Sequence, residues 1–257
     1  MAWGAARVAA DSETAARMRA LGRVREHSGQ MGDPVELRLK PLGGTPVAVR
    51  PGTADVDTVW AAFMRGPHRP PEHVARAGPR LIWDLGCNIG LTMADLAVRF
   101  PDAEIVGVEL DEANVRLARA NLAPWGERCR VIHAAVWPED GEVWYHSWAG
   151  ATSGYRVATP ERQATREGPV VPAVSLLSLL AAEGGEDHWV DYVKVDVEGA
   201  EAHLLRENTG WADGVGALKV EVHQPYTVDE CLADVRALGF AASRDSRHPA
   251  CVVGVRS

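Results

Sequence analysis

The stretch that decides the fold is Leu81-Ile-Trp-Asp-Leu-Gly-Cys-Asn-Ile-Gly90, followed one helix later by Val106-Gly-Val-Glu109. An apolar strand ends in Asp84 and turns through Gly86 and Gly90, and an acidic residue closes the next strand. Glycines let the backbone approach a ligand without a Cβ in the way, and the helix that follows directs its free N–H groups into the gap. This combination predicts a nucleoside-binding turn in a doubly wound α/β fold.

The spacing of the turn indicates which nucleoside it binds. Glu109 lies 19 residues after Gly90, where such folds place the carboxylate that binds two ribose hydroxyls. A dinucleotide turn reads Gly-x-Gly-x-x-Gly, but Asn88 stands at the middle glycine, so a pyrophosphate would lose its closest backbone approach. S-Adenosylmethionine has no phosphate, and its methionine ammonium can meet Asp84 and the turn carbonyls. The alternative is an ordinary glycine turn in an unrelated α/β protein.

The composition is that of an ordinary globular protein, with 46% hydrophobic and 24% charged residues among 257. A formal net charge of −8 argues against a nucleic-acid partner, because phosphate binding depends on clustered lysines and arginines. No stretch approaches the ~20 apolar residues of a membrane span, and the N-terminus lacks an apolar run of signal-peptide length. We therefore expect a cytoplasmic protein with a small-molecule acceptor and no membrane partner. A homo-oligomer is compatible with the sequence.

Cysteine spacing adds no metal or redox motif. Cys87, Cys129, Cys231 and Cys251 are far apart, and no Cys-x-x-Cys pair occurs. We expect four reduced thiols.

Residues 1–78 are predicted to form an N-terminal appendage that packs on the core and has no core of its own. Asp11 or Ser12 is a suitable cap for its first helix, and alternating residues around Gly43-Gly44 indicate a hairpin. The expected elements are a helix over 11–25, a hairpin of 35–40 and 46–50, and a helix over 56–64.

Residues 79–257 are predicted to form a catalytic domain that binds S-adenosylmethionine. Short apolar strands alternate with amphipathic helices, which is typical of a mostly parallel sheet with helices on both faces. We expect strands over 81–84, 104–110, 130–136, 192–196, 217–223 and 251–255, and helices over 91–100, 112–122, 176–182, 201–207 and 228–238.

An insertion interrupts this alternation. Residues 142–157 are rich in Trp, Tyr, Ser and Gly with a period of two, and 170–174 add a short strand, which predicts an antiparallel element over the edge or mouth of the sheet. Its aromatic residues are candidates for an acceptor pocket. They are Trp144, Tyr145, Trp148 and Tyr155.

Two later strands carry polar side chains along one face. Lys194, Asp196 and, if the strand continues, Glu198 share a face, and so do Lys219, Glu221 and His223. Central parallel strands are usually apolar on both faces, so these residues need an explanation. One explanation is a purely structural network of buried ion pairs, which suits the two lysines best. The other residues lie at the carboxyl ends of strands, where open α/β sheets bind ligands.

His223 is the candidate general base, because an unperturbed imidazole pKa of about 6.5 suits proton removal near neutrality. The alternative is a hydrogen-bonded structural histidine. Glu198 or Asp196 can orient His223, orient an acceptor hydroxyl or bind a metal. Asp196 and Glu221 offer the oxygen ligands that Mg²⁺ prefers, although nothing in the spacing requires a metal.

The adenine ring is expected beyond the second and third strands. Leu110 ends the second strand, and His133 with Ala134-Ala135 ends the third. Small side chains such as Ala135 make room for a flat base, and tight packing explains them equally well.

On these residues the chain resembles the class I S-adenosylmethionine-dependent methyltransferases, and more narrowly the FkbM family. The resemblance covers about residues 48–225, and its most specific part is the Lys-x-Asp-x-Glu-Gly-Ala-Glu stretch. Cys87 replaces an alanine common at that point. The matching segments are Asp84–Gly90, Val108-Glu109, Val193–Glu201, Glu221–His223, the strand and helix of 170–180 and, less securely, Arg50-Pro-Gly-Thr-Ala-Asp55.

The resemblance implies a Rossmann-like fold with a seven-stranded sheet and methyl transfer, commonly to a hydroxyl of a sugar, polyketide or similar natural product. Asp84 to Gly90, Glu109 and the region of Ala135 would hold the donor, while Asp196, Glu198 and His223 would face the acceptor. Methyl transfer to nitrogen or carbon, a nicotinamide-dependent oxidoreductase and a non-catalytic binding protein are the alternatives. A base is expected to matter for a hydroxyl acceptor and little for an amine.

Overall fold

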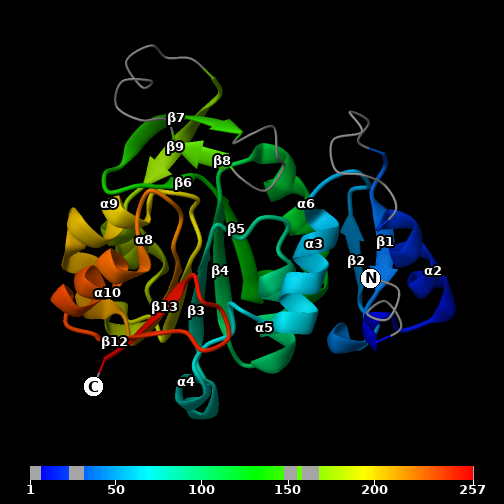
Figure 1. Ribbon diagram of the computed structural model, residues 1–257, viewed down its shortest axis with the longest axis horizontal. Helices are drawn as coiled ribbons and strands as arrows, with labels where there is room; N and C mark the ends of the chain where they lie inside the picture. Colours follow the sequence, from blue (N-terminus) through cyan, green and yellow to red (C-terminus); the bar gives the residue numbers. More distant parts are fainter. Residues whose placement is uncertain (1–6, 23–31, 148–154, 158–167, 257) are drawn as a thin grey trace.

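The fold is built on a seven-stranded sheet (Figure 1). The computed structural model describes residues 7–22, 32–147, 155–157 and 168–256. The sheet order is β12-β13-β11-β10-β3-β4-β5. The five strands from β11 to β5 run parallel to one another, and β13 runs antiparallel to β11 and β12, so the predicted mostly parallel sheet is confirmed. The bounds are β3 (Leu81–Leu85), β4 (Glu104–Glu109), β5 (Cys129–His133), β10 (Tyr192–Val195), β11 (Ala217–Glu221), β12 (Ala241–Arg244) and β13 (Cys251–Val255).

Helices cover both faces of this sheet, as predicted (Figure 1). Ile82 of β3 packs in one apolar cluster with Met93 and Leu117, whereas Trp83 packs in another with Leu204 and Val235. Neighbouring residues of one strand therefore serve opposite cores, as the period of two requires. The helices are α5 (Leu91–Arg99) and α6 (Glu112–Leu122) on one face, and α8 (Leu176–Glu183), α9 (Glu201–Arg206) and α10 (Val228–Ala237) on the other.

A smaller sheet forms the predicted antiparallel insertion. Its order is β6-β9-β7-β8, and β7 runs antiparallel to both neighbours. The bounds are β6 (Ala135–Val136), β7 (Gly141–Ser147), β8 (Tyr155–Val157) and β9 (Val170–Val174). One predicted strand is wrong: residues 130–136 form β5 and β6 separately. Ala134 lies between these two strands, and its backbone N–H donates to the Glu109 carbonyl in β4. Beyond Ala134 the chain leaves the main sheet, and β6 pairs with β9.

The N-terminal region forms the predicted helix, hairpin and helix. Leu37 and Val59 share one apolar cluster with Ile89 and Leu122 of the following region. The boundary at residue 78 stays a prediction. The elements are α2 (Ser12–Leu21), β1 (Val35–Arg38), β2 (Pro46–Val49), α3 (Asp55–Trp60), a π-helical turn (Ala61–Arg65) and α4 (Glu72–Ala77). Short 3₁₀ turns cover Lys40–Leu42, Ala123–Arg128, Glu186–His188 and Thr209–Gly214.

Two elements have no counterpart in the sequence-based expectation. Helix α4 has no buried residue and β12 is mostly exposed, so neither shows the apolar periodicity that reveals an element. The first helix ends at Leu21, earlier than predicted, and the rest of its expected range lies outside the described residues from 23 on.

Two expectations from composition can be compared with the structure. All four cysteines are free thiols. Among the helices of the described ranges, none is long and apolar enough to cross a membrane.

Candidate active site

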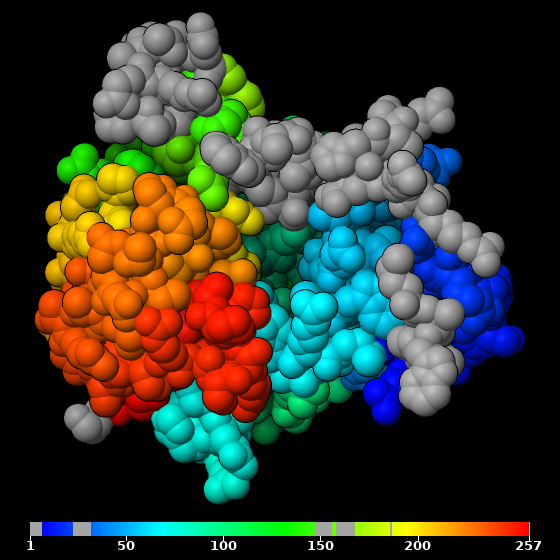
Figure 2. Space-filling model, viewed as in Figure 1, coloured from blue at the N-terminus to red at the C-terminus, as the bar shows by residue number. Residues whose placement is uncertain are grey.

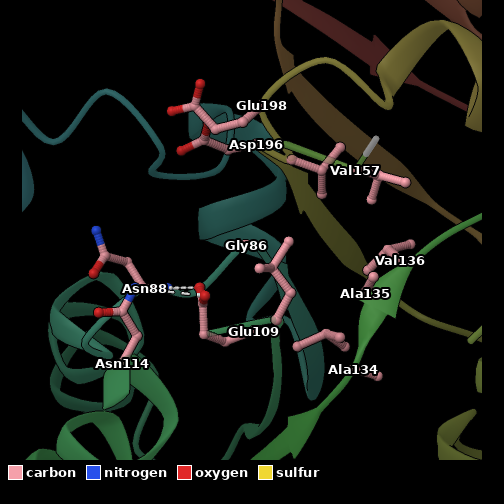
Figure 3. A pocket seen from close by; sticks show the side chains of 13 residues that line it. Gly86, Asn88, Glu109, Asn114, Ala134, Ala135, Val136, Val157, Asp196 and Glu198 are labelled. Atoms are coloured by element: carbon pink, nitrogen blue, oxygen red, sulfur yellow. Dashed lines mark hydrogen bonds between the residues drawn. The ribbon is translucent and has the colours of Figure 1, made fainter. Parts of the chain in front are cut away.

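A pocket opens at the carboxyl ends of the parallel strands, the place predicted for the ligand (Figure 3). It contains the predicted donor residues Gly86, Asn88, Glu109, Leu110 and Ala135 together with Asp196 and Glu198. Asp84, Gly90 and His223 do not line it. The full lining is Gly86, Asn88, Val108, Glu109, Leu110, Asn114, Ala134, Ala135, Val136, Val157, Asp196, Val197 and Glu198.

The glycine turn joins the two sides of this pocket. Gly86 has a φ of 78°, and a Cβ there would lie 1.8 Å from the carbonyl oxygen of Asp196. Asn88 has a φ of 50°, a left-handed conformation that asparagine adopts more readily than most residues. Gly90, with a φ of 80°, is the N-cap of α5. The turn therefore needs glycine at position 86, where it contacts the backbone that follows β10.

Glu109 is buried beneath the turn and held by backbone N–H groups. Asn88 donates to one carboxylate oxygen over 2.9 Å, and Asp111 donates to the other over 2.8 Å (Figure 3). Asn114 Nδ2 lies 3.5 Å from the second oxygen. Burial raises the pKa of Glu109 to about 7, against the lowering effect of these hydrogen bonds. Its side chain reaches the pocket wall, where ribose hydroxyls can donate to its remaining lone pairs.

Asp84 points into the protein rather than into the pocket. Its carboxylate is fully buried and lies 2.7 Å from Lys194 Nζ, which also donates to the Gly86 carbonyl over 2.7 Å. Burial raises the pKa of Asp84, and the charge of Lys194 opposes that shift. The predicted contact of Asp84 with the methionine ammonium stays a prediction. In this structure the Asp84–Lys194 ion pair, with the hydrogen bond to Gly86, links the glycine turn to β10.

Lys219 neighbours Lys194 in the strand register and has partners of its own. Its Nζ pairs with Asp245 and donates to the carbonyls of Pro67 and Arg69 over 2.7 and 2.9 Å. The structure thus favours the structural explanation for both buried lysines, with separate partners in place of one shared network.

Small side chains lie at the end of the pocket predicted for adenine. Ala134, Ala135 and Val136 line this wall beside Leu110. His133 is not in the lining, and its Nε2 lies 3.1 Å from the Leu110 carbonyl. The adenine site stays a prediction.

Asp196 and Glu198, predicted to face the acceptor, line the pocket on the side away from the alanines (Figure 3). β10 ends at Val195, so the continued strand considered for Glu198 is wrong. Glu198 instead adopts a φ of 52°, an uncommon conformation for a non-glycine residue, and still lines the pocket. Burial raises the pKa of Glu198. Burial by itself also raises the pKa of Asp196, but the charge of Lys194 brings it below its usual range.

His223 lies beside these two carboxylates and is held by a third. Its Nε2 is 3.7 Å from Asp196 and 3.5 Å from Glu198, whereas its Nδ1 is 2.7 Å from Glu201. Burial alone lowers the pKa of His223, but the hydrogen bond to Glu201 and the surrounding carboxylates raise it to about 9. Glu201, at the start of α9, is therefore the residue that orients His223, which was one of three roles considered for Glu198 or Asp196.

His68, which the sequence did not single out, reaches the same cluster from the N-terminal region. Its Nε2 lies 3.4 Å from Glu221 and 3.8 Å from Asp196. Burial and the charge of Lys194 lower its pKa to about 4, which keeps the imidazole neutral. Figure 2 shows the cyan segment that contains it lying against the red C-terminal segment. A histidine in a proline-rich loop gave no periodicity by which to place it.

Two groups in this region have metal-ligating atoms within 4.8 Å of one another. One is Asp196, Glu221 and His223, and the other is His68, Glu221 and Cys251. Burial and the charge of Asp196 raise the pKa of Glu221 to about 7. The first group offers nitrogen and oxygen ligands and the second adds the sulfur of Cys251, and such mixed ligands suit Zn²⁺ better than Mg²⁺, which prefers oxygen alone.

From the predicted insertion segments 142–157 and 170–174, the described residue that lines the pocket is Val157 in β8. Tyr145 is buried in the small apolar cluster of the insertion, and Trp144 is half-buried. Trp148 and the side chain of Tyr155 lie outside the described residues. The predicted aromatic acceptor pocket stays a prediction.

Comparison with known proteins identifies the family. Residues 84–240, well over half of the chain, match the Methyltransferase FkbM domain. A trans-aconitate 2-methyltransferase of Methylobacterium radiotolerans is 50% identical over 44 residues, which are 17% of each chain. That match leaves most of the relative's length uncovered.

Solved structures that resemble the chain are distant. A sugar N-methyltransferase of Streptoalloteichus is 16% identical with a TM-score of 0.43, over 78% of this chain and 92% of that one. A precorrin-6y C5,15-methyltransferase of Geobacter metallireducens is 11% identical with a TM-score of 0.41, over 69% and 80%. The family match over residues 84–240 carries the assignment: the chain belongs to the FkbM family of S-adenosylmethionine-dependent methyltransferases.

Proposed function

We propose that the enzyme transfers the methyl group of S-adenosylmethionine to a hydroxyl of a small acceptor, such as a sugar-containing or other natural product. One observation carries the proposal. Asp196 and Glu198 line the same pocket as Glu109 and the glycine turn, with His223 directly beside them. A titratable cluster of this kind next to a donor site suits an acceptor that must lose a proton.

The chemistry assigns different work to the two sides of the pocket. As the acceptor oxygen bonds to the methyl carbon, the bond from that carbon to sulfur breaks and the donor leaves as a thioether. Alignment of oxygen, carbon and sulfur supplies much of the rate, so the donor side must hold the nucleoside rigidly. The hydroxyl proton passes to the neutral form of His223, and Glu201 stabilises the resulting imidazolium.

The pKa of His223 sets the expected pH range. With a pKa of about 9, only a small fraction of the imidazole is neutral near pH 7. An essential base of this kind makes kcat/KM rise with pH until about 9. An unperturbed pKa near 6.5, which the sequence alone suggested, would place the rise about two and a half pH units lower.

The decisive experiment compares His223→Ala with His203→Ala. His203 is a matched control, because its Nδ1 also lies 2.7 Å from a glutamate, Glu207, but its side chain is exposed and outside the pocket. Each variant is assayed with wild type on a panel of paired hydroxyl and amine acceptors, and donor affinity is measured by calorimetry. We expect His223→Ala to lower kcat on hydroxyls about a hundredfold or more with unchanged donor affinity.

Other results of these assays would indicate one of the alternative functions. Methyl transfer to amines alone, unaffected by His223→Ala, would show an N-methyltransferase. Donor binding without transfer to any acceptor would favour a binding protein, and binding of NAD(H) in place of S-adenosylmethionine would overturn the donor.

A divalent cation at Asp196 and Glu221 remains a separate hypothesis. The ligand atoms of these two residues and His223 are close enough for a shared ion, but Asp196 already lies 3.4 Å from Lys194. Assay after thorough chelation, with and without added Mg²⁺, Mn²⁺ or Zn²⁺, tests it. Full activity in the chelated enzyme would exclude a catalytic metal.

A further inference from the structure

Arg50 and Asp55 form a buried ion pair in the N-terminal region, within the Arg-Pro-Gly-Thr-Ala-Asp segment. Arg50 is 8% exposed and Asp55 is 1% exposed. Two guanidinium nitrogens of Arg50 donate to the two carboxylate oxygens, each over 2.8 Å, and the Arg50 backbone N–H donates over 2.9 Å. This fork geometry fixes the direction of the guanidinium.

The same guanidinium reaches a residue of the donor pocket. Arg50 Nη2 donates over 2.6 Å to Oδ1 of Asn114, which lines the pocket and is itself 1% exposed. With its oxygen taken by Arg50, the amide must present its NH₂ group to the other side, where Glu109 lies (Figure 3). A flipped amide would set two oxygens against each other.

A second contact supports the glycine turn from β2, the strand just before Arg50. Asn121, two helical turns after Asn114 on α6, exchanges hydrogen bonds with both backbone groups of Ala48 in β2 over 2.7 and 3.1 Å. Its NH₂ group also donates over 2.9 Å to the carbonyl of Ile89, inside the turn. Residues 46–55 thus contact the donor site at two places, through two asparagines on one face of α6.

We propose that Arg50 is a positioning residue of the donor site. It orients the Asn114 amide so that its NH₂ group faces Glu109 and holds that carboxylate in place to accept the ribose hydroxyls of the donor. This inference rests on the proposed donor binding and extends it to the N-terminal region, which the sequence presented as an appendage.

A third contact does not by itself set the Arg50 pair apart, because Arg69 Nη2 also donates to the backbone carbonyl of Ala62 over 3.3 Å. Arg69 and Asp95 form a comparable pair, with contacts of 2.7 and 3.1 Å and a carboxylate 4% exposed, but neither residue lines the donor pocket. The Arg50 pair differs by its contact with Asn114. The comparison therefore offers a control in which a buried ion pair is lost without any change at Glu109.

The surroundings of Glu109 determine how a change at Arg50 will be seen. The titratable groups that face it are Asp111, Cys87 in the turn and Tyr145 of β7. The charge of Asp111 raises the pKa of Glu109, and the hydrogen bond from Asn114 lowers it. Loss of the Asn114 orientation is therefore expected to move the pKa of Glu109 upward.

The experiment measures the affinity for S-adenosylhomocysteine by calorimetry between pH 6 and 8.5, together with the thermal midpoint. Arg50→Lys keeps the charge but cannot hold Asp55 and Asn114 at once. Asn114→Asp keeps an acceptor for Arg50, and hence the fold, but sets a carboxylate beside Glu109. Asp95→Asn is the control.

For Arg50→Lys we expect about a tenfold higher Kd and an affinity that is gained at higher pH than in wild type. Asn114→Asp should raise the Kd more than tenfold with a nearly unchanged thermal midpoint. Asp95→Asn should lower the midpoint and leave the Kd and its pH dependence as in wild type.

Two results would overturn the inference: wild-type affinity and pH dependence in Asn114→Asp, or an Arg50→Lys variant that behaves like Asp95→Asn. If Arg50→Lys does not fold, Asn114→Asp still decides. Failure of the wild-type protein to bind S-adenosylhomocysteine would instead contradict the proposed function.

Discussion

The two sides of the pocket are built in different ways. The donor side is made largely of backbone: Glu109 accepts hydrogen bonds from the backbone N–H groups of Asn88 and Asp111, and only the third donor, Asn114 Nδ2, is a side chain. The acceptor side collects side chains from separate elements, with Asp196 and Glu198 after β10, Glu201 on α9 and His223 after β11. A constant ligand suits a site made of backbone, while a variable acceptor suits a site made of side chains.

The electrostatics differ in the same way. On the donor side one carboxyl, Glu109, has a pKa raised to about 7 by burial. On the acceptor side the pKa of His223 is raised to about 9 while that of His68 is lowered to about 4. Proximity to Glu201 accounts for the first, and burial near Lys194 for the second. Opposite shifts in neighbouring groups are typical of sites that move protons.

Gly86 is where the two sides meet, so its substitution is expected to have the largest effect. In Gly86→Ala the new Cβ would overlap the Asp196 carbonyl oxygen at 1.8 Å and force the turn away from β10. We expect a loss of about 3 kcal/mol or more in the free energy of unfolding, with donor binding and activity both abolished. Chemical denaturation and calorimetry measure the two effects.

Gly44→Ala separates strain from contact. Gly44 has a similar φ of 83°, but nothing lies within 4 Å of its Cβ position. It should cost about 1 kcal/mol and leave donor affinity intact. Equal effects of the two substitutions would show that backbone strain, and not contact with Asp196, makes glycine necessary at position 86.

The construction of the donor side explains what could be predicted from the sequence. The strand, the glycine turn and Glu109 belong to one continuous unit, so their spacing alone placed Gly86, Asn88 and Glu109 in one pocket. The alternation of strands and helices likewise predicted the main sheet, because each buried strand carries its own apolar pattern. Exposed elements such as β12 carry no such pattern.

The acceptor side was harder to predict from the sequence, because its geometry depends on how the strands end. β11 stops at Glu221, and the chain beyond the strand then carries His223 toward Glu201 at the start of the preceding helix, α9. Glu201 was visible in the motif, but its pairing with His223 was not. Asp84 shows the opposite case: its place in the motif suggested a ligand contact, whereas Lys194, far along the chain, takes its carboxylate.

Glu201→Gln tests whether the buried charge of Glu201 controls the activity of His223 as a base. The substitution keeps the shape and removes the charge that holds the pKa of His223 near 9. We expect kcat to fall about tenfold to a hundredfold with unchanged donor affinity, and the rise of kcat/KM with pH to move below 9. Steady-state assays from pH 6 to 10 measure both.

The same substitution has a consequence for stability. A histidine whose pKa is raised in the folded state stabilises the protein fully below about 6.5, and this stabilisation is lost as the pH rises through about 9. Wild type should therefore exceed Glu201→Gln in stability most at low pH. Glu207→Gln, at the exposed partner of His203, is the matched control and should change neither profile. A pH profile of Glu201→Gln identical to wild type would contradict a role for His223 as the base.

The donor side should show a smaller pH dependence, in binding and not in turnover. The pKa of Glu109 is about 7 in the free protein, and ribose hydroxyls that donate to its carboxylate favour the ionised form, so binding lowers that pKa. Donor affinity is then expected to improve as the pH rises toward 7 and to level off above it, with a Kd about tenfold higher at pH 6 than at pH 8. Calorimetry with S-adenosylhomocysteine on wild type and Glu109→Gln measures this, because glutamine cannot ionise and should bind weakly without the change around pH 7. The same pH dependence in both proteins would assign the titration to another group and leave the donor side without a titrating residue.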